Sequence, residues 1–243
     1  DRVMAGVELL RTLRVDFNVL ACVHAASAGR GLEVYRFLRD EARAPMIQFI
    51  PVVEREERGG ASARSIAGRQ YGEFLIAVFD EWVRRDVGSV FVQIFDVALG
   101  VWFGQPSALC VFAETCGDAL ALEHDGDLYS CDHFVAPAFK LGNIARTPLR
   151  ELVASPQQRR FGQDKRDALP RFCRECPVRF VCNGGCPKDR ILATPDGEPG
   201  LNYLCEGFRA FFTRVDRPMR IMADLLRRRR PAAEIMSLQT GPC

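Results

Sequence analysis

The chain has 243 residues, 48% of them hydrophobic, which is enough to bury the core of one large domain or two small ones. It carries 33 basic and 31 acidic residues, and this formal net charge of +2 gives no general electrostatic reason to expect a nucleic-acid partner. No apolar run reaches the roughly 18 to 20 residues of a membrane-spanning helix, and the first residues do not resemble a cleavable signal peptide. We therefore predict a cytoplasmic protein with neither nucleic acid nor membrane among its partners.

The first hundred residues alternate between helical and strand patterns. Apolar residues at helical spacing predict helices at 2–13, 32–42, 69–85 and 97–104, and apolar runs of strand length predict strands at 15–23, 46–53 and 89–95. Strands that alternate with helices indicate parallel βα units. Because the series begins in mid-pattern, and at Asp1 instead of Met, we interpret the chain as a fragment that lacks earlier βα units.

The character of the sequence changes near Pro106. Residues 119–131 predict two short strands around the turn at Asp125 and Gly126, the strongest short hairpin signal. A loop at 131–143, a helix at 148–161, a Pro/Gly-rich loop at 193–203 and a long helix at 207–229 follow. We place a boundary at Ser107 and predict an α/β fold. Its parts are half of a βα barrel at 1–106, a cysteine-rich α+β module at 107–206, and a C-terminal helix and tail at 207–243.

Eight of the ten cysteines fall between Cys110 and Cys205, which is the most informative feature of the composition. The spacing is Cys110-x5-Cys116-x14-Cys131, then Cys173-x2-Cys176-x5-Cys182-x3-Cys186, and finally x18 to Cys205. Eight thiols are enough for two four-ligand metal sites. The other two are expected to be inert, Cys22 inside a strand predicted to be buried and Cys243 at the end of the tail.

Three explanations compete for these thiols: disulfides, structural zinc and iron-sulfur clusters. Disulfides belong to exported proteins, and a chain of this size with an ample core does not need them. Tetrahedral zinc is typically held by paired C-x2-C motifs, yet only Cys173 and Cys176 form such a pair. An iron-sulfur cluster is wider and collects its ligands from looser spacings, which favours the third explanation.

The x2, x5, x3 spacing ends in Cys-Pro and is similar to the bacterial ferredoxin run, in which the cysteine before proline ligates the other cluster. By this analogy there is a first set, Cys110, Cys116, Cys131 and Cys186, and a second set, Cys173, Cys176, Cys182 and Cys205. Gly184 and Gly185 agree with this interpretation, because a chain that passes between two clusters needs a permissive backbone.

Several segments resemble a known family. They are VFVQIFDVALG, CGDALALEHDGDLYSCDHFV, LGNI, FCRECPVRFVCNGGCPKDR and TPDGEPGLNYLC. In these segments the chain resembles the C-terminal portion of anaerobic sulfatase-maturating enzymes, which are radical S-adenosylmethionine (SAM) enzymes with a SPASM domain. The resemblance covers nearly the whole chain and is most specific between Cys110 and Cys205.

The resemblance implies a fold, a reaction and partners. The fold is the second half of a partial (β/α)6 radical SAM barrel followed by a SPASM module. In the complete enzyme SAM binds to a [4Fe-4S] cluster on a C-x3-C-x2-C motif, and a Cys or Ser in a C/S-x-P-x-R segment of a sulfatase is oxidised to Cα-formylglycine. An electron donor such as flavodoxin or ferredoxin is implied as well. This chain has no C-x3-C-x2-C motif, so we expect the fragment alone to be inactive.

The resemblance also implies roles for individual residues. The first set would hold one auxiliary [4Fe-4S] cluster and the second set another, and both would accept or relay the substrate electron. Asp132 matches an aspartate that takes the substrate proton; without the resemblance, a hydrogen-bonding role in a turn is the simpler interpretation. His124 and His133 are expected to pack or to hydrogen-bond, whereas His24, at the end of a predicted strand, is a candidate for the barrel cavity.

Two other functions stay open at this point. The chain could belong to another radical SAM enzyme that modifies peptides through the same module. It could also be a non-catalytic iron-sulfur protein for electron transfer or peptide docking, because it lacks the SAM-cluster motif.

Overall fold

The computed structural model describes residues 2–57 and 59–238, and the chain divides into two compact units. Unit 1 combines Asp1–Pro106 with Leu204–Cys243, and unit 2 is Ser107–Tyr203. The end of the chain therefore returns to the unit in which the chain begins. No helix within the described ranges is both long enough and apolar enough to cross a bilayer.

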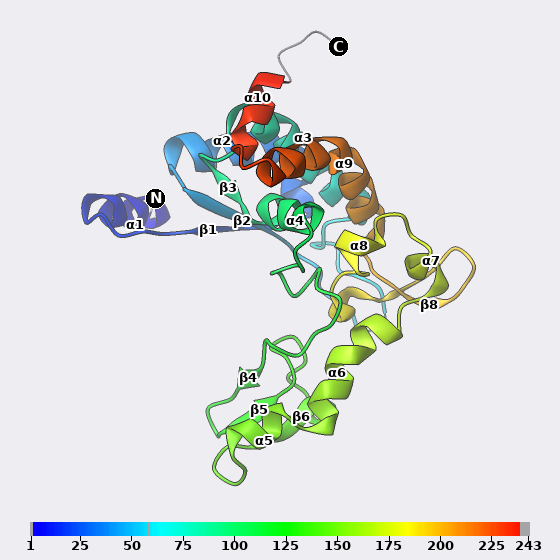
Figure 1. The fold of residues 1–243 in the computed structure, drawn as a ribbon. Helices are drawn as coiled ribbons and strands as arrows, with labels where there is room; N and C mark the ends of the chain where they lie inside the picture. Colours follow the sequence, from blue (N-terminus) through cyan, green and yellow to red (C-terminus); the bar gives the residue numbers. More distant parts are fainter. Residues whose placement is uncertain (1, 58, 239–243) are drawn as a thin grey trace. The chain divides into compact units, whose positions relative to one another are not determined.

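Unit 1 is a mixed α/β structure (Figure 1). Its elements are α1 (Arg2–Thr12), β1 (Val19–Val23), η1 (Ala25–Arg30), α2 (Gly31–Arg36), η2 (Phe37–Glu41), β2 (Met46–Pro51), α3 (Gly68–Arg85), β3 (Phe91–Val92), α4 (Gln93–Phe103), α9 (Cys205–Arg227), η5 (Ala232–Glu234) and α10 (Ile235–Leu238). In the described part of the chain the sheet has the order β1-β2-β3, and both pairings are parallel. The predicted α/β class is confirmed.

Two strand predictions need correction. The third strand ends after two residues, because α4 begins at Gln93 and buries Ile94, Phe95 and three further residues at helical spacing. The run at 93–95 is apolar enough for a buried strand, and its periodicity becomes clear only when it is read together with the following turn of helix. The first strand is not buried throughout, since Cys22 is exposed on β1.

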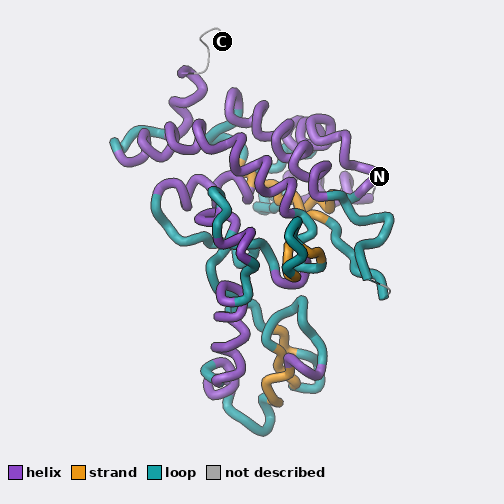
Figure 2. The backbone as a smooth tube through the Cα atoms, turned by 90° about the vertical axis from the view of Figure 1, so that its right-hand side faces the viewer, coloured by secondary structure: helices purple, strands orange, loops and turns teal. Residues whose placement is uncertain are grey.

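Helices α3 and α9 run close together in both backbone views (Figures 1 and 2), and glycines make the close approach possible. A Cβ added to Gly72 would lie 2.6 Å from the Cα of Gly207, and one added to Gly207 would overlap the carbonyl oxygen of Gly68. The same two helices bury Phe79 and Phe211, whose rings meet edge to face at 6.1 Å. The α3–α9 contact is therefore closely packed.

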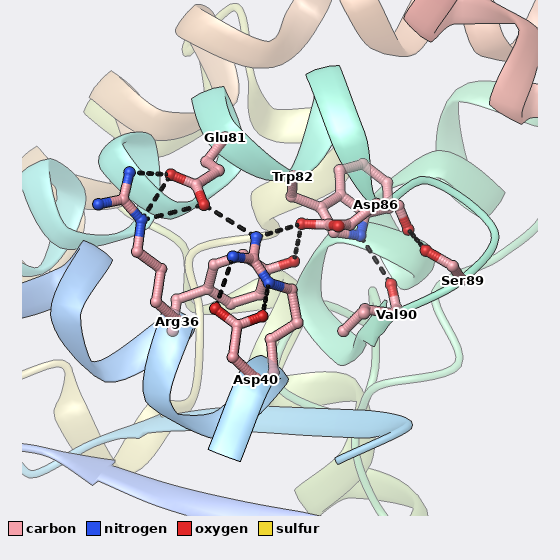
Figure 3. Close-up of polar contacts among 9 residues, drawn as sticks. Arg36, Asp40, Glu81, Trp82, Asp86, Ser89 and Val90 are labelled. Carbon is pink, nitrogen blue, oxygen red and sulfur yellow. Dashed lines mark hydrogen bonds and ion pairs between the residues drawn. The ribbon is translucent and has the colours of Figure 1, made fainter. Parts of the chain in front are cut away.

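A buried ion-pair network ties α2 and η2 to the end of α3 (Figure 3). Glu81 is only 5% exposed and accepts from Arg36 Nε at 3.0 Å and from Arg39 Nη1 at 2.8 Å. Arg39 Nη1 also reaches Asp86 Oδ2 at 3.0 Å, and the Tyr35 hydroxyl donates to the same oxygen at 2.7 Å. The hydrogen bond from Arg36 lowers the pKa of Glu81, so this buried carboxylate is compensated by the cations around it.

Unit 2 consists of short elements. They are β4 (Ala121–Leu122), β5 (Asp127–Tyr129), η3 (Pro137–Phe139), β6 (Lys140–Asn143), α5 (Leu149–Val153), α6 (Pro156–Asp167), α7 (Arg171–Arg174), α8 (Arg179–Cys182), η4 (Pro187–Asp189), β7 (Leu192–Ala193) and β8 (Pro199–Leu201). The predicted hairpin is present, with Leu122 opposite Leu128 and Gly126 at φ +88° in its turn. Strand β6, which pairs with β5, lies in a segment predicted to be a loop.

The predicted helix at 148–161 is in fact two helices, because Ser155 caps a new one. Its hydroxyl accepts from the backbone N–H of Gln158 at 3.2 Å, and Pro156 occupies the first helical position. The longer helix, α6, packs Phe161 against Phe134 and Phe139, with ring centroids 5.5 and 5.8 Å apart. In this way α6 packs against the segment that connects β5 to β6.

We expect Gly207→Ala to lower the free energy of unfolding by about 1 to 3 kcal/mol, because the new methyl group would overlap backbone atoms that cannot rotate away. Urea denaturation of the metal-free chain measures this. Gly100→Ala in α4 is the matched control, since nothing lies within 4 Å of its added Cβ, and alanine is expected to be neutral or stabilising there. Equal stability of both variants would contradict the close contact.

Asp96 on α4 is expected to make stability depend on pH. One of its carboxylate oxygens is buried without a hydrogen-bond partner in the described residues, and burial raises the pKa of Asp96 to about 6. The group therefore ionises at a lower pH in the unfolded chain than in the folded one, so the folded state loses stability as pH rises from about 4 to about 6.

Asp96→Asn is neutral at every pH and should remove this loss, which we expect to be roughly 1 to 3 kcal/mol across the window. The measurement is the unfolding free energy of both proteins in a pH series from 4 to 8. Asp16→Asn, an exposed carboxylate, serves as the control. A difference between wild type and Asp96→Asn that stays constant with pH would contradict the assignment.

Candidate metal centre

Seven of the eight clustered cysteines lie in unit 2, and Cys205 is the first residue of α9 in unit 1. Cys110 and Cys116 lie in the loop before β4, Cys131 follows β5, and Cys186 precedes η4. The nine cysteines within the described ranges form no disulfide with one another. Cys243 lies outside the described residues.

One face of α6 holds the loops that carry the first set. Gln158, which is 3% exposed, donates from Nε2 to the carbonyl oxygens of Gly117 at 2.8 Å and Ser130 at 3.1 Å. Gly117 directly follows Cys116, and Ser130 directly precedes Cys131. One helical turn later, Gly162 accepts from the backbone N–H of Cys116 at 3.0 Å, and a Cβ on Gly162 would overlap the Cys116 carbonyl oxygen.

The third contact of this face is made by Lys165, whose side chain is buried at 1% exposure. Its ammonium donates to the carbonyl oxygens of Cys110 at 2.5 Å and Val111 at 3.0 Å. Positions 158, 162 and 165 lie on one side of a helix, because they are separated by four and three residues. Thus α6 positions the backbone at or beside three of the four cysteines of the first set.

The fourth cysteine, Cys186, is approached through a strained segment. Asn183, Gly184 and Gly185 have φ values of +46°, +71° and +61°, a region that favours glycine. A Cβ on Gly184 would overlap the side chain of Leu169. This left-handed run turns the chain sharply between Cys182 and Cys186, so the two cysteines can face different surroundings.

Two amide side chains hold this turn. Asn202 Nδ2 donates to the carbonyl oxygens of Gly184 at 3.3 Å and Cys186 at 3.2 Å. Asn183 Nδ2 donates at 2.9 Å to the carbonyl oxygen of Phe112, two residues after Cys110. The Cys186 segment and the Cys110 loop are therefore joined directly.

The structure brings the thiols of the first set together. Cys110 and Cys186 are each close enough to Cys116 to interact with it electrostatically, and Cys186 interacts in the same way with Cys131. Ligation of one cluster by these four thiols stays a prediction. Their proximity is nevertheless what that prediction requires.

Burial makes these thiols weak acids in the absence of a metal. It is the main cause that raises the pKa of Cys186 to about 11 and that of Cys131 to about 12. Burial also raises the pKa of Cys116 and Cys173. Because metal ligation needs thiolates, binding must release protons here, and an electropositive environment would favour it.

Such an environment is present, because two cations lie among the thiols. Lys165 interacts with Cys116, Cys186 and Cys110, and each of these thiols opposes the lowering of the lysine's pKa by burial. Arg190 interacts with Cys173 and Cys182 of the second set as well as with Cys116 and Cys186. Neither cation forms an ion pair with a carboxylate in the part of the chain that the structure describes.

The second set is only partly assembled within unit 2. Cys173 lies on α7 and accepts, through its carbonyl oxygen, from the backbone N–H of Cys176 at 3.2 Å. Cys182 is the last residue of α8. Cys205 belongs to the other unit, so its membership of this set stays a prediction.

Asp132 is exposed, in a turn directly after Cys131. Its Oδ1 accepts from the Cys131 thiol at 3.1 Å, and its backbone N–H donates to the Ala119 carbonyl oxygen at 3.1 Å. A ligating Cys131 would be a thiolate and could not donate, so this bond belongs to the free thiol. Metal binding would therefore leave the Asp132 carboxylate available for another donor.

The three histidines are outside this arrangement. His124 is exposed, with its nearest charged partner Glu123 at 4.0 Å, and His133 is exposed as well. Neither histidine packs in the core, which leaves hydrogen bonding as the part of the expectation that stays a prediction. His24 is exposed and caps η1 by accepting from the backbone N–H of Ala26 at 3.2 Å.

The donor set fits an anionic iron-sulfur cluster. In the described residues no three His, Cys, Asp or Glu side chains lie close enough to hold one metal ion. A [4Fe-4S] cluster takes one thiolate on each iron, so its ligands stand further apart than the ligands of a single ion. The buried Lys165 and the partly buried Arg190 also suit a group with net negative charge.

The sequence alone did not identify Gln158, Lys165 or Arg190. The segment around Lys165 is strongly polar, and nothing in it separates one buried lysine from its exposed neighbours. Arg190 lies four residues after Cys186, and that short distance was the only available signal.

The SPASM family, described as an iron-sulfur cluster-binding domain, matches residues 110–177. A serine-type anaerobic sulfatase-maturating enzyme of Bacteroides thetaiotaomicron is 42% identical over 256 residues, which cover 99% of this chain and 62% of the relative. A cysteine-type anaerobic sulfatase-maturating enzyme of Clostridium perfringens is 28% identical over 216 residues, which cover 87% of this chain and 57% of the relative.

Solved structures agree with these relatives. Native anSMEcpe with bound AdoMet and the Cp18Cys peptide matches with a TM-score of 0.81 and 27% identity, over 92% of this chain and 62% of that chain. The complex with AdoMet alone matches with a TM-score of 0.80. The chain spans about three fifths of the length of these proteins. Over the part that it spans, the chain is therefore a relative, in sequence and in fold, of the anaerobic sulfatase-maturating enzymes, with a SPASM domain at residues 110–177.

Proposed function

We propose that this chain is the C-terminal part of a radical SAM sulfatase maturase, which oxidises a Cys or Ser in a C/S-x-P-x-R segment of a sulfatase to Cα-formylglycine. The observation that carries the proposal is the convergence of the first-set cysteines on α6 within a unit that matches the SPASM domain. The relatives named as sulfatase-maturating enzymes, and the AdoMet and peptide bound in their solved structures, support it.

The three βα units of unit 1 would complete a partial (β/α)6 barrel. A third [4Fe-4S] cluster and SAM would bind in the other half of that barrel, because this chain contains no C-x3-C-x2-C motif. For the same reason, the 243 residues alone are expected to form no substrate radical. An electron donor such as flavodoxin or ferredoxin would be required.

In unit 2, the first set would hold one auxiliary cluster, and Cys173, Cys176 and Cys182 would hold another together with Cys205. When bound, such clusters supply one-electron transfer. With four cysteines each they have no open iron site, so the substrate itself would contact other groups. The role of α6 is to hold the cysteine loops in place.

Asp132 would act as the proton acceptor. Removal of a hydrogen atom and of an electron from the substrate carbon leaves the thiol or hydroxyl proton to be taken up, and a carboxylate is a natural base for it. The exposure of Asp132 and its position beside Cys131 support this role. Because identity is higher to the serine-type than to the cysteine-type relative, a serine-containing peptide is the first substrate to test.

Pairs of cysteine substitutions test how the clusters are assigned. The unsubstituted chain should hold about eight irons and eight sulfides. Cys116→Ala with Cys186→Ala is expected to keep about half of the iron, since both belong to the first set, whereas Cys182→Ala with Cys186→Ala should lose nearly all of it. The measurement is iron, acid-labile sulfide and zinc per chain after anaerobic reconstitution.

Cys22→Ala is the control for this experiment, because the exposed Cys22 belongs to neither set. If the pair Cys182→Ala and Cys186→Ala retained about half of the iron, the four neighbouring cysteines would serve one cluster. About two zinc ions with little iron would show structural zinc sites and would remove the electron-transfer role.

Asp132→Asn, placed in a longer protein that includes the SAM-binding half, should lower formylglycine formation about 100-fold or more, because an amide cannot accept the proton. Iron content should stay near wild type. Mass spectrometry of a serine-containing C/S-x-P-x-R peptide measures the product. Asp164→Asn, an exposed carboxylate on α6, is the control, and equal turnover by both variants would exclude Asp132 from the mechanism.

A further inference from the structure

Lys165 is an unusual residue to find in a protein interior. It is 1% exposed, and its ammonium donates to two carbonyl oxygens, those of Cys110 and Val111. Burial of an ammonium without an anionic partner costs several kcal/mol in typical proteins. The described residues place no carboxylate within ion-pair distance of it. Some other negative charge is therefore needed to offset this cost.

The Arg190 guanidinium is also bonded to backbone carbonyl oxygens, in the turn between Cys182 of the second set and Cys186 of the first. It donates to the carbonyl oxygens of Gly184 at 3.2 Å, Asn183 at 3.2 Å and Gly185 at 3.5 Å. These are the three residues that connect Cys182 of the second set to Cys186 of the first. A further bond of 2.8 Å, from Nη1 to the Lys165 carbonyl oxygen, joins the two cationic residues through the backbone.

Both cations are thus held by backbone carbonyls and surrounded by thiols. The thiols that interact with Lys165 most strongly, Cys116, Cys186 and Cys110, belong to the first set, whereas Arg190 interacts with thiols of both sets. Burial is the main cause that lowers the pKa of both groups, and the charge of Arg190 lowers the pKa of Lys165 further. This arrangement is costly for the metal-free protein and favourable once negative charge is added to both thiol sets.

We propose that Lys165 and Arg190 are the charge-compensating residues of the two auxiliary clusters, Lys165 for the first and Arg190 for both, and that they raise the reduction potentials of these clusters. The inference rests on the proposed two-cluster assignment. A cluster with four thiolates carries net negative charge, and one-electron reduction adds one more. A nearby cation stabilises the reduced form more than the oxidised form, and net charge around a cluster is one of the factors that set its potential.

A purely structural role is the alternative for Lys165, since its bonds also fix the Cys110 loop to α6. An ammonium is not needed for that task alone. Gln158 performs the equivalent task for two other carbonyl oxygens with a neutral amide on the same face of α6. A charged group at position 165 is therefore better explained by compensation of the negative charge of a bound cluster.

The test uses the 243-residue chain reconstituted anaerobically with iron and sulfide. Cys176→Ala leaves only the first cluster and Cys116→Ala only the second, so that a single signal is followed in each. In an EPR-monitored redox titration, Lys165→Met should lower the reduction equilibrium constant of the first cluster about tenfold, or about 59 mV for one electron. It should leave the second unchanged, whereas Arg190→Met should lower both.

Arg160→Met is the matched control, because it removes one positive charge from the same helix at an exposed position. Its midpoint potentials should equal those of the unsubstituted chain. If Lys165→Met and Arg160→Met have the same first-cluster potential, the inference is wrong. Iron and sulfide in the unsubstituted chain test the cluster assignment separately, so failure of that proposal is recognised before any potential is compared.

If Lys165→Met does not take up iron, the stability of the metal-free variant to urea tests the inference instead. If the lysine is present to balance a cluster, the metal-free variant should be at least as stable to urea as the wild type, and Lys165→Arg should still load. If the metal-free variant is less stable than the wild type, Lys165 is a structural residue and the inference is overturned.

Discussion

The buried face of α6 is the contact on which unit 2 depends. Gln158, Gly162 and Lys165 bind backbone groups at or beside three cysteines that are far apart in the sequence. None of these contacts involves the thiols, so the side chains of the cysteines remain available. A short unit with few buried apolar residues can hold loops in this way, because backbone hydrogen bonds in a dry environment are costly to break.

The same face brings positive charge to the thiols. Free thiols with raised pKa values are neutral near pH 7, so in the metal-free protein the charges of Lys165 and Arg190 lack an anion among the described residues. Cluster binding would convert the thiols to ligands with net negative charge. Under the proposed assignment, folding of unit 2 and metal binding would therefore be coupled through electrostatics as well as through geometry.

Unit 1 is held together by different contacts. Its stability comes from apolar packing, with α3 and α9 in contact at Gly72 and Gly207, and from carboxylates that are buried with arginines. In the network around Glu81 the buried carboxylate has arginines beside it. Lys165 in unit 2 differs, because no carboxylate among the described residues lies within ion-pair distance of it.

The sequence by itself determined the alternation of strands and helices, the hairpin at Asp125 and Gly126, and the cysteine spacing, because these are local patterns with local causes. It could not determine that residues 93–95 continue a helix, that β6 joins the hairpin, or that Cys22 is exposed. Those outcomes depend on neighbours that are distant in the sequence. The positions of Lys165 and Arg190 beside the cysteine loops were decided only by tertiary structure, since a cation in contact with these loops and one on the surface look alike until the surrounding segments are known.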